Sequence, residues 1–471
     1  MALFYLKGLF TIVAPGHLAI SPASAGADCL LWNYAEVMGL FDAHPCVALY
    51  LCGHTHRLVG LACIFRRGSF VSVPEDDKCT LHHHEAAQTV NDEQPLKDNG
   101  HVKKTLPQGA ETPATGAAAP RLLAQPRWEP IRAAPLSFRT TAELTTFLGQ
   151  LEGIVRAELT SRRYNTLGNL LHFYAAYRRA GPGTDLADFY RAYEARVVED
   201  GLSCVGLSLH LAREIRRAFA GASPFLVSCE EWIPDVEAYC RSDPPDASSV
   251  KEHVLVALRV LVRDGARGGL ILMDPGYHVG FPVAVMDDGR PPHRGHFVQS
   301  NTAKSVKEYS YEAMGSRYVR WRVRETRAGC IKQWDNVLYV GGAFQSALAY
   351  SEKRNLLYDF RTLVARDGTG PSAGVYCKLN EVNRNPVFTL FYAKEGSRAE
   401  VKLPFYLFAS ATKRSPEVEA ATKVAAECAA EVGVSAGELL KTLRGVADLY
   451  EDVDFVNGLL DLNRRVDPFD A

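Results

Sequence analysis

Three residues that could act together on an acyl group follow one another along the sequence: Cys204, His253 and Asp274. A cysteine thiolate is a strong nucleophile, a histidine can take up and return a proton, and a carboxylate can hold the imidazole in one tautomer. Each residue alone has a simpler interpretation, as a buried cysteine, an ordinary strand histidine and a turn former. Their joint occurrence in this order favours catalysis by a Cys-His-Asp triad.

The thiol falls at the predicted start of a helix. Ser203 is a good N-cap residue, which places Cys204 in the first turn of a helix over residues 203–219. The positive end of the helix dipole and the backbone N–H groups of that turn favour a thiolate and can stabilise an oxyanion. His210 lies on the same helix but points away from Cys204, so it is a poor candidate for the base.

The histidine and the aspartate lie on two predicted strands. His253 opens a strand over residues 253–262, and Asp274 ends a strand over residues 269–274. A hairpin with its turn near 264–268 would place the two side chains across from each other. Both could then project toward the helix N-terminus that carries the thiol.

The rest of this half of the chain combines helices and strands. Apolar residues three and four apart predict helices over 142–159, 166–179, 186–199 and 203–219, with an alanine-rich helical region over 417–460. β-branched and aromatic runs predict strands over 253–262, 269–274, 281–287, 336–340, 375–379 and 387–392. Helices followed by a run of strands predict an α+β domain with a helical bundle and an antiparallel sheet.

The thiol at a helix start, His-Val-Leu-Val at 253–256 and Leu-Met-Asp-Pro-Gly-Tyr at 272–277 resemble the catalytic order of arylamine N-acetyltransferases. The resemblance covers about residues 140–410 and extends to the broader transglutaminase-like, papain-related cysteine enzymes. It implies a thiol nucleophile, a histidine base and an orienting aspartate. It also implies acetyl-CoA or another acyl-CoA as donor and an amine as acceptor, although Asp-Gly-Leu-Ser precedes the cysteine here where that family usually has Arg-Gly-Gly-x.

A second chemistry is possible near the start of the chain. His54 and His56 follow an apolar run in the motif Gly-His-Thr-His, and two imidazoles at a strand exit can be directed at one or two metal ions. His17 follows the strand-like run 8–14 and could supply a third nitrogen. A helix-like stretch over 30–41 lies between the two runs, which predicts a β-α-β arrangement.

These motifs resemble the C-terminal half of calcineurin-like metallophosphoesterases. His-Leu-Ala-Ile-Ser-Pro at 17–22, Leu-Trp-Asn-Tyr at 31–34 and Gly-His-Thr-His at 53–56 are most similar to the manganese-dependent ADP-ribose/CDP-alcohol diphosphatases, over about residues 8–85. The resemblance implies an α/β fragment whose three histidines would hold manganese. That family's Asp-x-His, Gly-Asp and Gly-Asn-His blocks belong upstream of these motifs, so we expect an inactive remnant.

Composition predicts four segments. Residues 86–135 turn polar and then rich in proline, alanine and glycine, which is typical of a disordered linker. We therefore predict a truncated metallophosphoesterase-like segment over 1–85 and a linker over 86–135. A Cys-His-Asp transferase-like domain follows over 136–410, and a C-terminal helical region over 411–471.

Net charge and cysteine content indicate which partners and which cellular compartment to expect. Lys and Arg number 53 against 54 Asp and Glu, a net charge of −1, so we expect small-molecule partners rather than nucleic acid or an anionic membrane. The 11 cysteines lack paired spacing, which favours reduced thiols and a cytoplasmic protein. A signal peptide over 1–25 is the alternative, but Pro15, Gly16 and His17 interrupt its apolar stretch. No run approaches the roughly 18 to 20 apolar residues of a membrane helix.

Three functions remain in competition. The first is cysteine-dependent acyl transfer, with the N-terminal segment as an inactive remnant. The second is a metal-dependent diphosphatase that uses His17, His54 and His56. The third is a non-catalytic scaffold that retains both folds. The oligomeric state stays open.

Overall fold

The computed structural model divides the chain into two units, residues 1–101 and 102–471. In the first unit it describes strands β1 (Ala2–Leu6), β2 (Leu9–Val13), β3 (Cys63–Arg66) and β4 (Ser69–Ser72), which form two antiparallel pairs. In the second unit it describes residues 122–123, 126–197, 203–246, 251–302, 305–344, 348–379 and 386–466. The predicted metal ligands His17, His54 and His56 lie outside the described residues.

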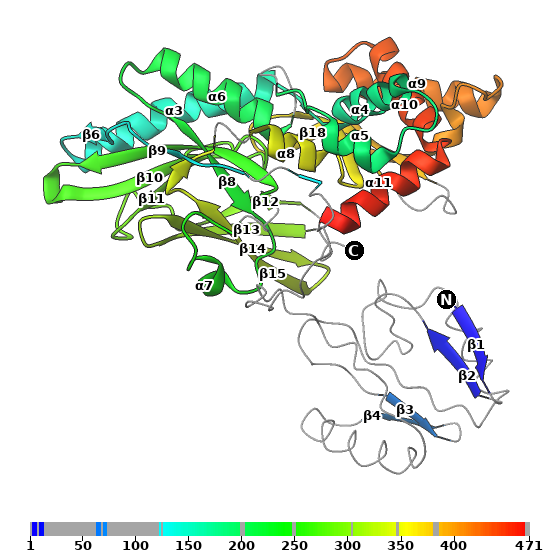
Figure 1. Ribbon diagram of the computed structural model, residues 1–471, viewed down its shortest axis with the longest axis horizontal. Coiled ribbons are helices and arrows are strands. Elements are labelled where there is room, and N and C mark those ends of the chain that lie inside the picture. The colour runs from blue at the N-terminus through cyan, green and yellow to red at the C-terminus, as the bar shows by residue number, and fades with distance from the viewer. Residues whose placement is uncertain are drawn as a thin grey trace, which may run out of the picture. The chain divides into compact units, whose positions relative to one another are not determined.

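A nine-stranded sheet organises much of the second unit (Figure 1). Its strand order is β11-β10-β9-β8-β15-β14-β13-β12, and these neighbours are antiparallel. A short strand, β6, pairs parallel with the far end of β9. The strands are β6 (Leu136–Phe138), β8 (Phe225–Glu230), β9 (His253–Val262), β10 (Arg267–Met273), β11 (Val283–Met286), β12 (His296–Asn301), β13 (Ser305–Met314), β14 (Tyr318–Arg327) and β15 (Cys330–Tyr339).

Two helices, α3 (Thr141–Ser161) and α6 (Cys204–Ala218), cover one face of this sheet. Each begins at a side-chain N-cap and buries residues three and four apart, as an amphipathic helix requires. Alternate residues of β9 point to the two faces. Val254, Val256 and Leu258 pack against the helices, whereas Leu255 and Ala257 pack in a core on the other face.

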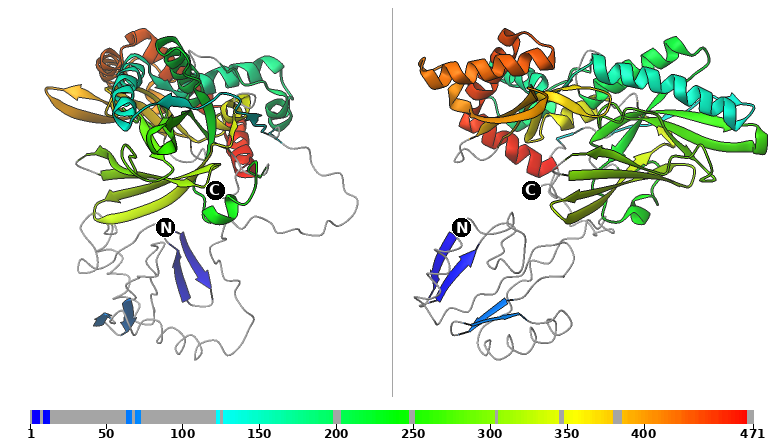
Figure 2. Two further views of the ribbon diagram at one scale, coloured as in Figure 1. Left: turned by 90° about the vertical axis from the view of Figure 1, so that its left-hand side faces the viewer. Right: turned by 180° about the vertical axis from the view of Figure 1, so that it is seen from behind.

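A second, five-stranded sheet has the order β20-β19-β18-β17-β7. Helices from distant parts of the chain share one hydrophobic core with it, and Figures 1 and 2 show the three C-terminal helices gathered around it. The predicted C-terminal helical region is therefore packed on residues of the preceding segment. The elements are β7 (Tyr164–Asn165), β17 (Phe360–Arg366), β18 (Pro371–Lys378), β19 (Val387–Lys394), β20 (Ser397–Pro404), α4 (Thr166–Ala180), α5 (Leu186–Ala192), α9 (Pro416–Val432), α10 (Ala436–Tyr450) and α11 (Val453–Val466).

Four further short elements belong to the described second unit. Strands β5 (Glu129–Pro130) and β16 (Gly342–Ala343) pair with each other, and α7 (Val236–Tyr239) packs near β15. Helix α8 (Leu348–Asn355) contacts both α6 and β9. This contact places α8 beside the start of the thiol helix.

The mixture of helix and sheet agrees with the predicted α+β class, and β9 has the bounds that the sequence predicts. One helix is shorter than predicted. The pattern over 186–199 predicts a long helix, but α5 ends at Ala192 and Tyr193 adopts an extended backbone. Its ring packs on Phe173 with the ring centroids 4.9 Å apart, a contact that a continuing helix would redirect.

The hairpin register also differs from the prediction. The turn is tighter than expected, because Ala266 N–H bonds to the carbonyl of Arg263 and β10 begins at Arg267. The ladder pairs Met273 with Val256. Asp274 therefore continues the ladder diagonal to His253 rather than directly across from it. The two side chains still share one face of the sheet, since the register shift is even.

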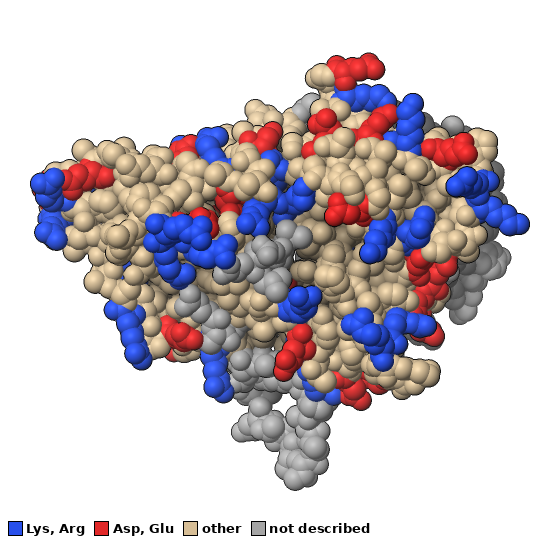
Figure 3. Space-filling view, turned by 90° about the horizontal axis from the view of Figure 1, so that it is seen from above, with Lys and Arg blue, Asp and Glu red and all other residues tan. Residues whose placement is uncertain are grey.

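The surface carries charges of both signs. Figure 3 shows basic and acidic side chains interspersed over the face that holds α3 and α6, in keeping with the net charge of −1. Within the described residues, no helix combines the length and the apolar character needed to cross a membrane.

Candidate active site

The candidate nucleophile lies at the start of α6, as the sequence predicts. Ser203 is the N-cap, and its hydroxyl oxygen accepts a hydrogen bond from the backbone N–H of Val205 at 3.2 Å. Cys204 is the first residue of the helix and is 3% exposed. Its sulfur therefore sits in the turn where the N–H groups of a helix point outward and the dipole favours negative charge.

The candidate base and its orienting group form a buried pair. His253 Nε2 lies 2.9 Å from Asp274 Oδ2, and the two residues are 4% and 3% exposed. The other carboxylate oxygen of Asp274 accepts the backbone N–H of Tyr277 at 2.9 Å. Both carboxylate oxygens are thus engaged, and the imidazole has its Nδ1 left for another partner.

That other partner is the thiol. The side chain of Cys204 lies beside the imidazole ring of His253 and helps to hold the proton on it. The lack of a side chain at Gly276 makes the approach possible, because a Cβ there would lie 2.8 Å from both Cys204 Cβ and His253 Cε1. The same position would be 3.4 Å from Asp274 Oδ1. The structure thus brings together the three residues that the sequence places in one site.

The charge balance of the pair favours a protonated imidazole. Burial alone lowers the pKa of His253. The negative charge of Asp274, its hydrogen bond and the contact with Cys204 together outweigh that effect and raise the pKa of His253 well above its usual value. A histidine that holds its proton beside a cysteine is the arrangement that supports a thiolate–imidazolium pair.

Aromatic rings and a second carboxyl group, that of Glu231, lie around the histidine. The ring of Tyr277 stands edge-on to His253 with their centroids 4.8 Å apart, and Trp321 lies 4.7 Å from Tyr277. The Tyr277 hydroxyl donates to Glu231, whose two carboxylate oxygens both lie 2.6 Å away. Burial raises the pKa of Glu231 despite the nearby imidazole of His253. These contacts pack the imidazole ring against buried aromatic side chains.

Helix α8 supplies two polar contacts that the sequence does not predict. Asn355 Nδ2 donates to Cys204 Sγ at 3.5 Å, from a position 151 residues further along the chain. Glu352, one turn earlier, accepts hydrogen bonds from the hydroxyl of Ser203 and, at 3.3 Å, from Asn169. Burial raises the pKa of Glu352 to about 7. No local motif marks either residue, since their partners come from remote segments.

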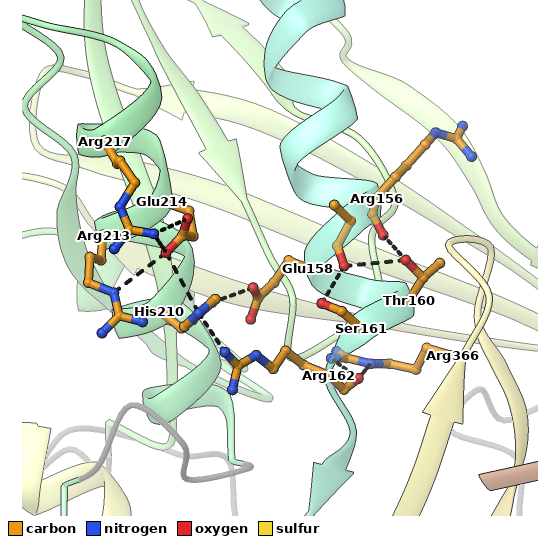
Figure 4. A network of polar contacts seen from close by, with 11 residues as sticks. Arg156, Glu158, Thr160, Ser161, Arg162, His210, Arg213, Glu214, Arg217 and Arg366 are labelled. Atoms are coloured by element: carbon orange, nitrogen blue, oxygen red, sulfur yellow. Dashed lines mark hydrogen bonds and ion pairs between the residues drawn. The ribbon is translucent and has the colours of Figure 1, made fainter. Parts of the chain in front are cut away.

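His210 belongs to a different network, as expected from its place on the helix. Figure 4 shows it directed toward Glu158 of α3, with Nδ1 at 2.6 Å from the carboxylate. Arg162 donates to Nε2 at 2.8 Å and, through its carbonyl, accepts from Arg366 at 2.8 Å. Arg366 also donates to the carbonyl of Pro275, the residue after Asp274. This network joins α3, α6 and β17.

A cavity in the second unit lies apart from the thiol. A cavity of about 240 Å³ at the ends of α4 and α5 shares no lining residue with the Cys204 site; it is bounded by His172, Ala175, Ala176, Arg179, Tyr193, Glu194 and Arg196. Among the described residues, no group of three or more His, Cys, Asp or Glu side chains could hold a metal ion. The predicted manganese ligands belong to the part of the chain that is not described.

Comparison with known proteins gives two partial likenesses. No protein-family model matches the chain. The manganese-dependent ADP-ribose/CDP-alcohol diphosphatase of Xenopus laevis is 50% identical over 41 residues, which cover 9% of this chain and 12% of that protein. The Mus musculus diphosphatase is 40% identical over 45 residues, or 10% and 13% of the two chains. The predicted resemblance to these diphosphatases is therefore supported over a short stretch.

A solved structure gives the other likeness. The arylamine N-acetyltransferase of Nocardia farcinica aligns with 56% of this chain and 78% of its own, at 11% identity and a TM-score of 0.30. At that TM-score the likeness does not assign the fold. The functional argument therefore depends on the geometry of the site.

Proposed function

We propose that the second unit transfers an acyl group from an activated donor to an amine, with Cys204 as the nucleophile. The observation that supports this proposal is the chain of contacts from Asp274 through His253 to a thiol at a helix N-terminus. Each member has the surroundings that its role requires: a carboxylate held by a backbone N–H, an imidazole with one nitrogen engaged and one facing sulfur, and a capped helix start.

The reaction proceeds in two half-reactions. The thiolate of Cys204 attacks the acyl carbon, a C–S bond forms, and the carbonyl electron pair moves onto oxygen. When the carbonyl re-forms, the bond to the leaving group breaks, and His253 donates its proton to that group. The amine then attacks the thioester of Cys204 and gives its proton to His253 as the C–S bond breaks. The thiolate is regenerated without an oxidant or reductant.

The proposed donor is acetyl-CoA or another acyl-CoA, and the proposed acceptor is an aromatic amine. These substrates come from the resemblance of the motifs around Cys204, His253 and Asp274 to arylamine N-acetyltransferases. A reduced thiol nucleophile also fits the proposed cytoplasmic location.

An acyl-enzyme experiment tests the proposal. The full-length protein is mixed with p-nitrophenyl acetate or acetyl-CoA, and peptide mass spectrometry follows acetylation of each cysteine. We expect one acetyl group on Cys204, discharged by an added aromatic amine. Cys330 is an exposed free thiol in the same chain and serves as the internal control. Acetylation of Cys204 no faster than that of Cys330 would overturn the proposal and favour the non-catalytic scaffold.

A second function concerns the first unit and draws on the 50% identity over 41 residues with a manganese-dependent diphosphatase. We propose that any metal chemistry there uses His17, His54 and His56. Imidazole nitrogens are suitable ligands for a divalent metal, and the metal would polarise a phosphoryl oxygen. The test is manganese binding and ADP-ribose hydrolysis by the full chain, against the variant His54→Ala. Equal behaviour of both proteins would end this second proposal.

A further inference from the structure

We propose that Asn355 is a further catalytic residue, whose side-chain amide stabilises first the thiolate of Cys204 and then the oxyanion of the acyl intermediate. This inference rests on the proposed acyl transfer. Its starting point is the contact of Asn355 Nδ2 with Cys204 Sγ at 3.5 Å, a distance suited to an N–H···S hydrogen bond. The nitrogen of a side-chain amide only donates, so the contact favours the negatively charged form of the sulfur.

The donor is held in place from its own backbone. The carbonyl of Asn355 accepts a hydrogen bond from Arg361 Nη1 at 2.8 Å, and Arg361 is 1% exposed. The preceding residue, Arg354, is fully buried and donates to Asn463 Oδ1 at 2.8 Å. Two buried guanidinium groups thus fix the end of α8. A donor that is already fixed needs little reorganisation when charge develops, which is the basis of oxyanion stabilisation.

The sulfur has different neighbours on its different sides. The imidazole of His253 lies beside it, and the first turn of α6 presents its backbone N–H groups toward the helix start. Asn355 approaches from a separate helix. In a tetrahedral intermediate the oxyanion is two bonds from Sγ. A donor that contacts the sulfur can therefore pass its hydrogen bond to that oxygen by a small rotation of its side chain.

The neighbouring polar residue of α8 does not share this role. Glu352 contacts the N-cap Ser203 rather than the sulfur, and its carboxylate oxygens accept hydrogen bonds from Ser203 and from Asn169. The backbone of Asn355 is held by Arg361 whatever its side chain. The side-chain amide is thus dispensable for the position of α8, and it donates its hydrogen bond to the sulfur.

Three variants test the inference in the full-length protein: Asn355→Ala removes the donor, Asn355→Asp replaces it by an acceptor of the same shape, and Asn355→Gln retains an amide. Acyl-enzyme formation from p-nitrophenyl acetate should fall about 10²- to 10³-fold in Asn355→Ala, the usual effect of one lost oxyanion donor. We expect Asn355→Asp to fall at least as far and Asn355→Gln to recover part of the rate.

A second readout separates catalysis from structure. Iodoacetamide alkylation of Cys204, followed against pH, should have its midpoint shifted upward in Asn355→Ala and further upward in Asn355→Asp, because a carboxylate repels the thiolate. Asn301→Ala, at the end of β12, is the matched control and should follow the wild-type profile. Asn355→Asp preserves the size of the side chain, so it remains informative if Asn355→Ala unfolds.

The outcomes distinguish this inference from the function on which it rests. If the wild-type protein forms no acyl-enzyme on Cys204, the proposed function itself fails. If the wild-type protein forms it and both Asn355→Ala and Asn355→Asp react within about twofold of that rate, the role of Asn355 is overturned while the triad stands. An unchanged pH profile of alkylation in Asn355→Asp would overturn the contact with the thiolate.

Discussion

Within the part of the chain that the structure describes, two buried histidine–carboxylate pairs lie close to helix α6, and they differ in the chemistry that they can support. His253 lies 2.9 Å from Asp274, and His210 lies 2.6 Å from Glu158. Burial, short distance and partner type are nearly alike. What differs is the second ring nitrogen. The ring of His253 lies beside the thiol of Cys204, whereas the second nitrogen of His210 accepts a hydrogen bond from Arg162.

The second nitrogen decides what each imidazole can do. Arginine only donates, so Nε2 of His210 must present its lone pair and the proton must stay on Nδ1, toward Glu158. His210 has no nitrogen left to accept a proton from a reacting group. His253 lies beside the thiol of Cys204, with which its remaining nitrogen can exchange a proton. A histidine–carboxylate pair therefore indicates catalysis only when its remaining nitrogen meets a group that reacts.

The largest expected effect comes from removing each imidazole in turn. His253→Ala should slow acyl-enzyme formation on Cys204 about 10³-fold, since a positioned general base contributes roughly 10² to 10⁴. His210→Ala should leave the rate of the folded protein within a few fold, although it unpairs the buried Glu158 and costs about 3 kcal/mol of stability. Stopped-flow acylation and thermal unfolding measure the two effects. Equal losses of rate in the two variants would erase the distinction.

The carboxylates give the next test. Asp274→Asn keeps the shape of the side chain but removes the charge that holds the proton on His253, so we expect a loss of about 10² to 10³ in acylation rate. Glu158→Gln is the matched change in the other pair. It should keep the wild-type rate, because Glu158 contacts no atom of the reacting groups. A normal rate in Asp274→Asn would mean that His253 needs no orienting charge.

Local signals predict most of the triad but not its surroundings. Ser203 as N-cap and the β-branched run from His253 place the nucleophile and base on their elements without any tertiary information. The register was harder to predict, because the turn closed by Arg263 and Ala266 lies one residue later than the turn that would pair Asp274 with His253, which makes Asp274 a diagonal neighbour. Contact geometry still permits the bond, since side chains reach across one diagonal step.

The contacts that residues from distant parts of the chain make with the site could not be predicted from the sequence. Asn355 and Glu352 meet the thiol helix only because α8 packs on α6 and β9, and a single amide or carboxyl has no spacing signature of its own. Strand β14 was also missed. Its alternation of arginines with Trp321 and Val323 is the period-2 pattern of a half-buried strand, so that signal was available in the sequence.

A third buried carboxyl group, that of Glu352, extends the comparison to a carboxyl without a histidine partner. Its contribution to the stability of the protein should depend on pH. Burial raises its pKa from 4.5 to about 7, so the folded state binds more protons than the unfolded state between those values. Stability contributed by the neutral carboxyl is therefore lost as pH rises through that window. Glu352→Gln should remove this loss. Above pH 7 its free energy of unfolding should therefore exceed that of the wild-type protein by about 3 kcal/mol.

Urea unfolding at pH 5 and pH 8 measures that change. The exposed Glu312→Gln on β13 is the control and should leave the difference between the two pH values as in the wild-type protein. A Glu352→Gln protein with the same pH dependence as wild type would contradict the assignment of a buried neutral carboxyl to this position.

The smallest expected effect concerns the space beside the imidazole of His253. Gly276 leaves this space open because it has no side chain. A methyl group at Gly276 would lie 2.8 Å from both Cys204 Cβ and His253 Cε1, well inside van der Waals contact. Gly276→Ala should therefore push thiol and imidazole apart and slow acylation about tenfold, in line with an overpacking cost of roughly 1 to 3 kcal/mol. Gly149→Ala on α3 has nothing within 4 Å of the added carbon and should react at the wild-type rate. A Gly276→Ala protein that is acylated as fast as Gly149→Ala would show that the close approach of Cys204 and His253 is not needed. The proposed difference between the His253–Asp274 pair and the His210–Glu158 pair would then lose its geometric basis.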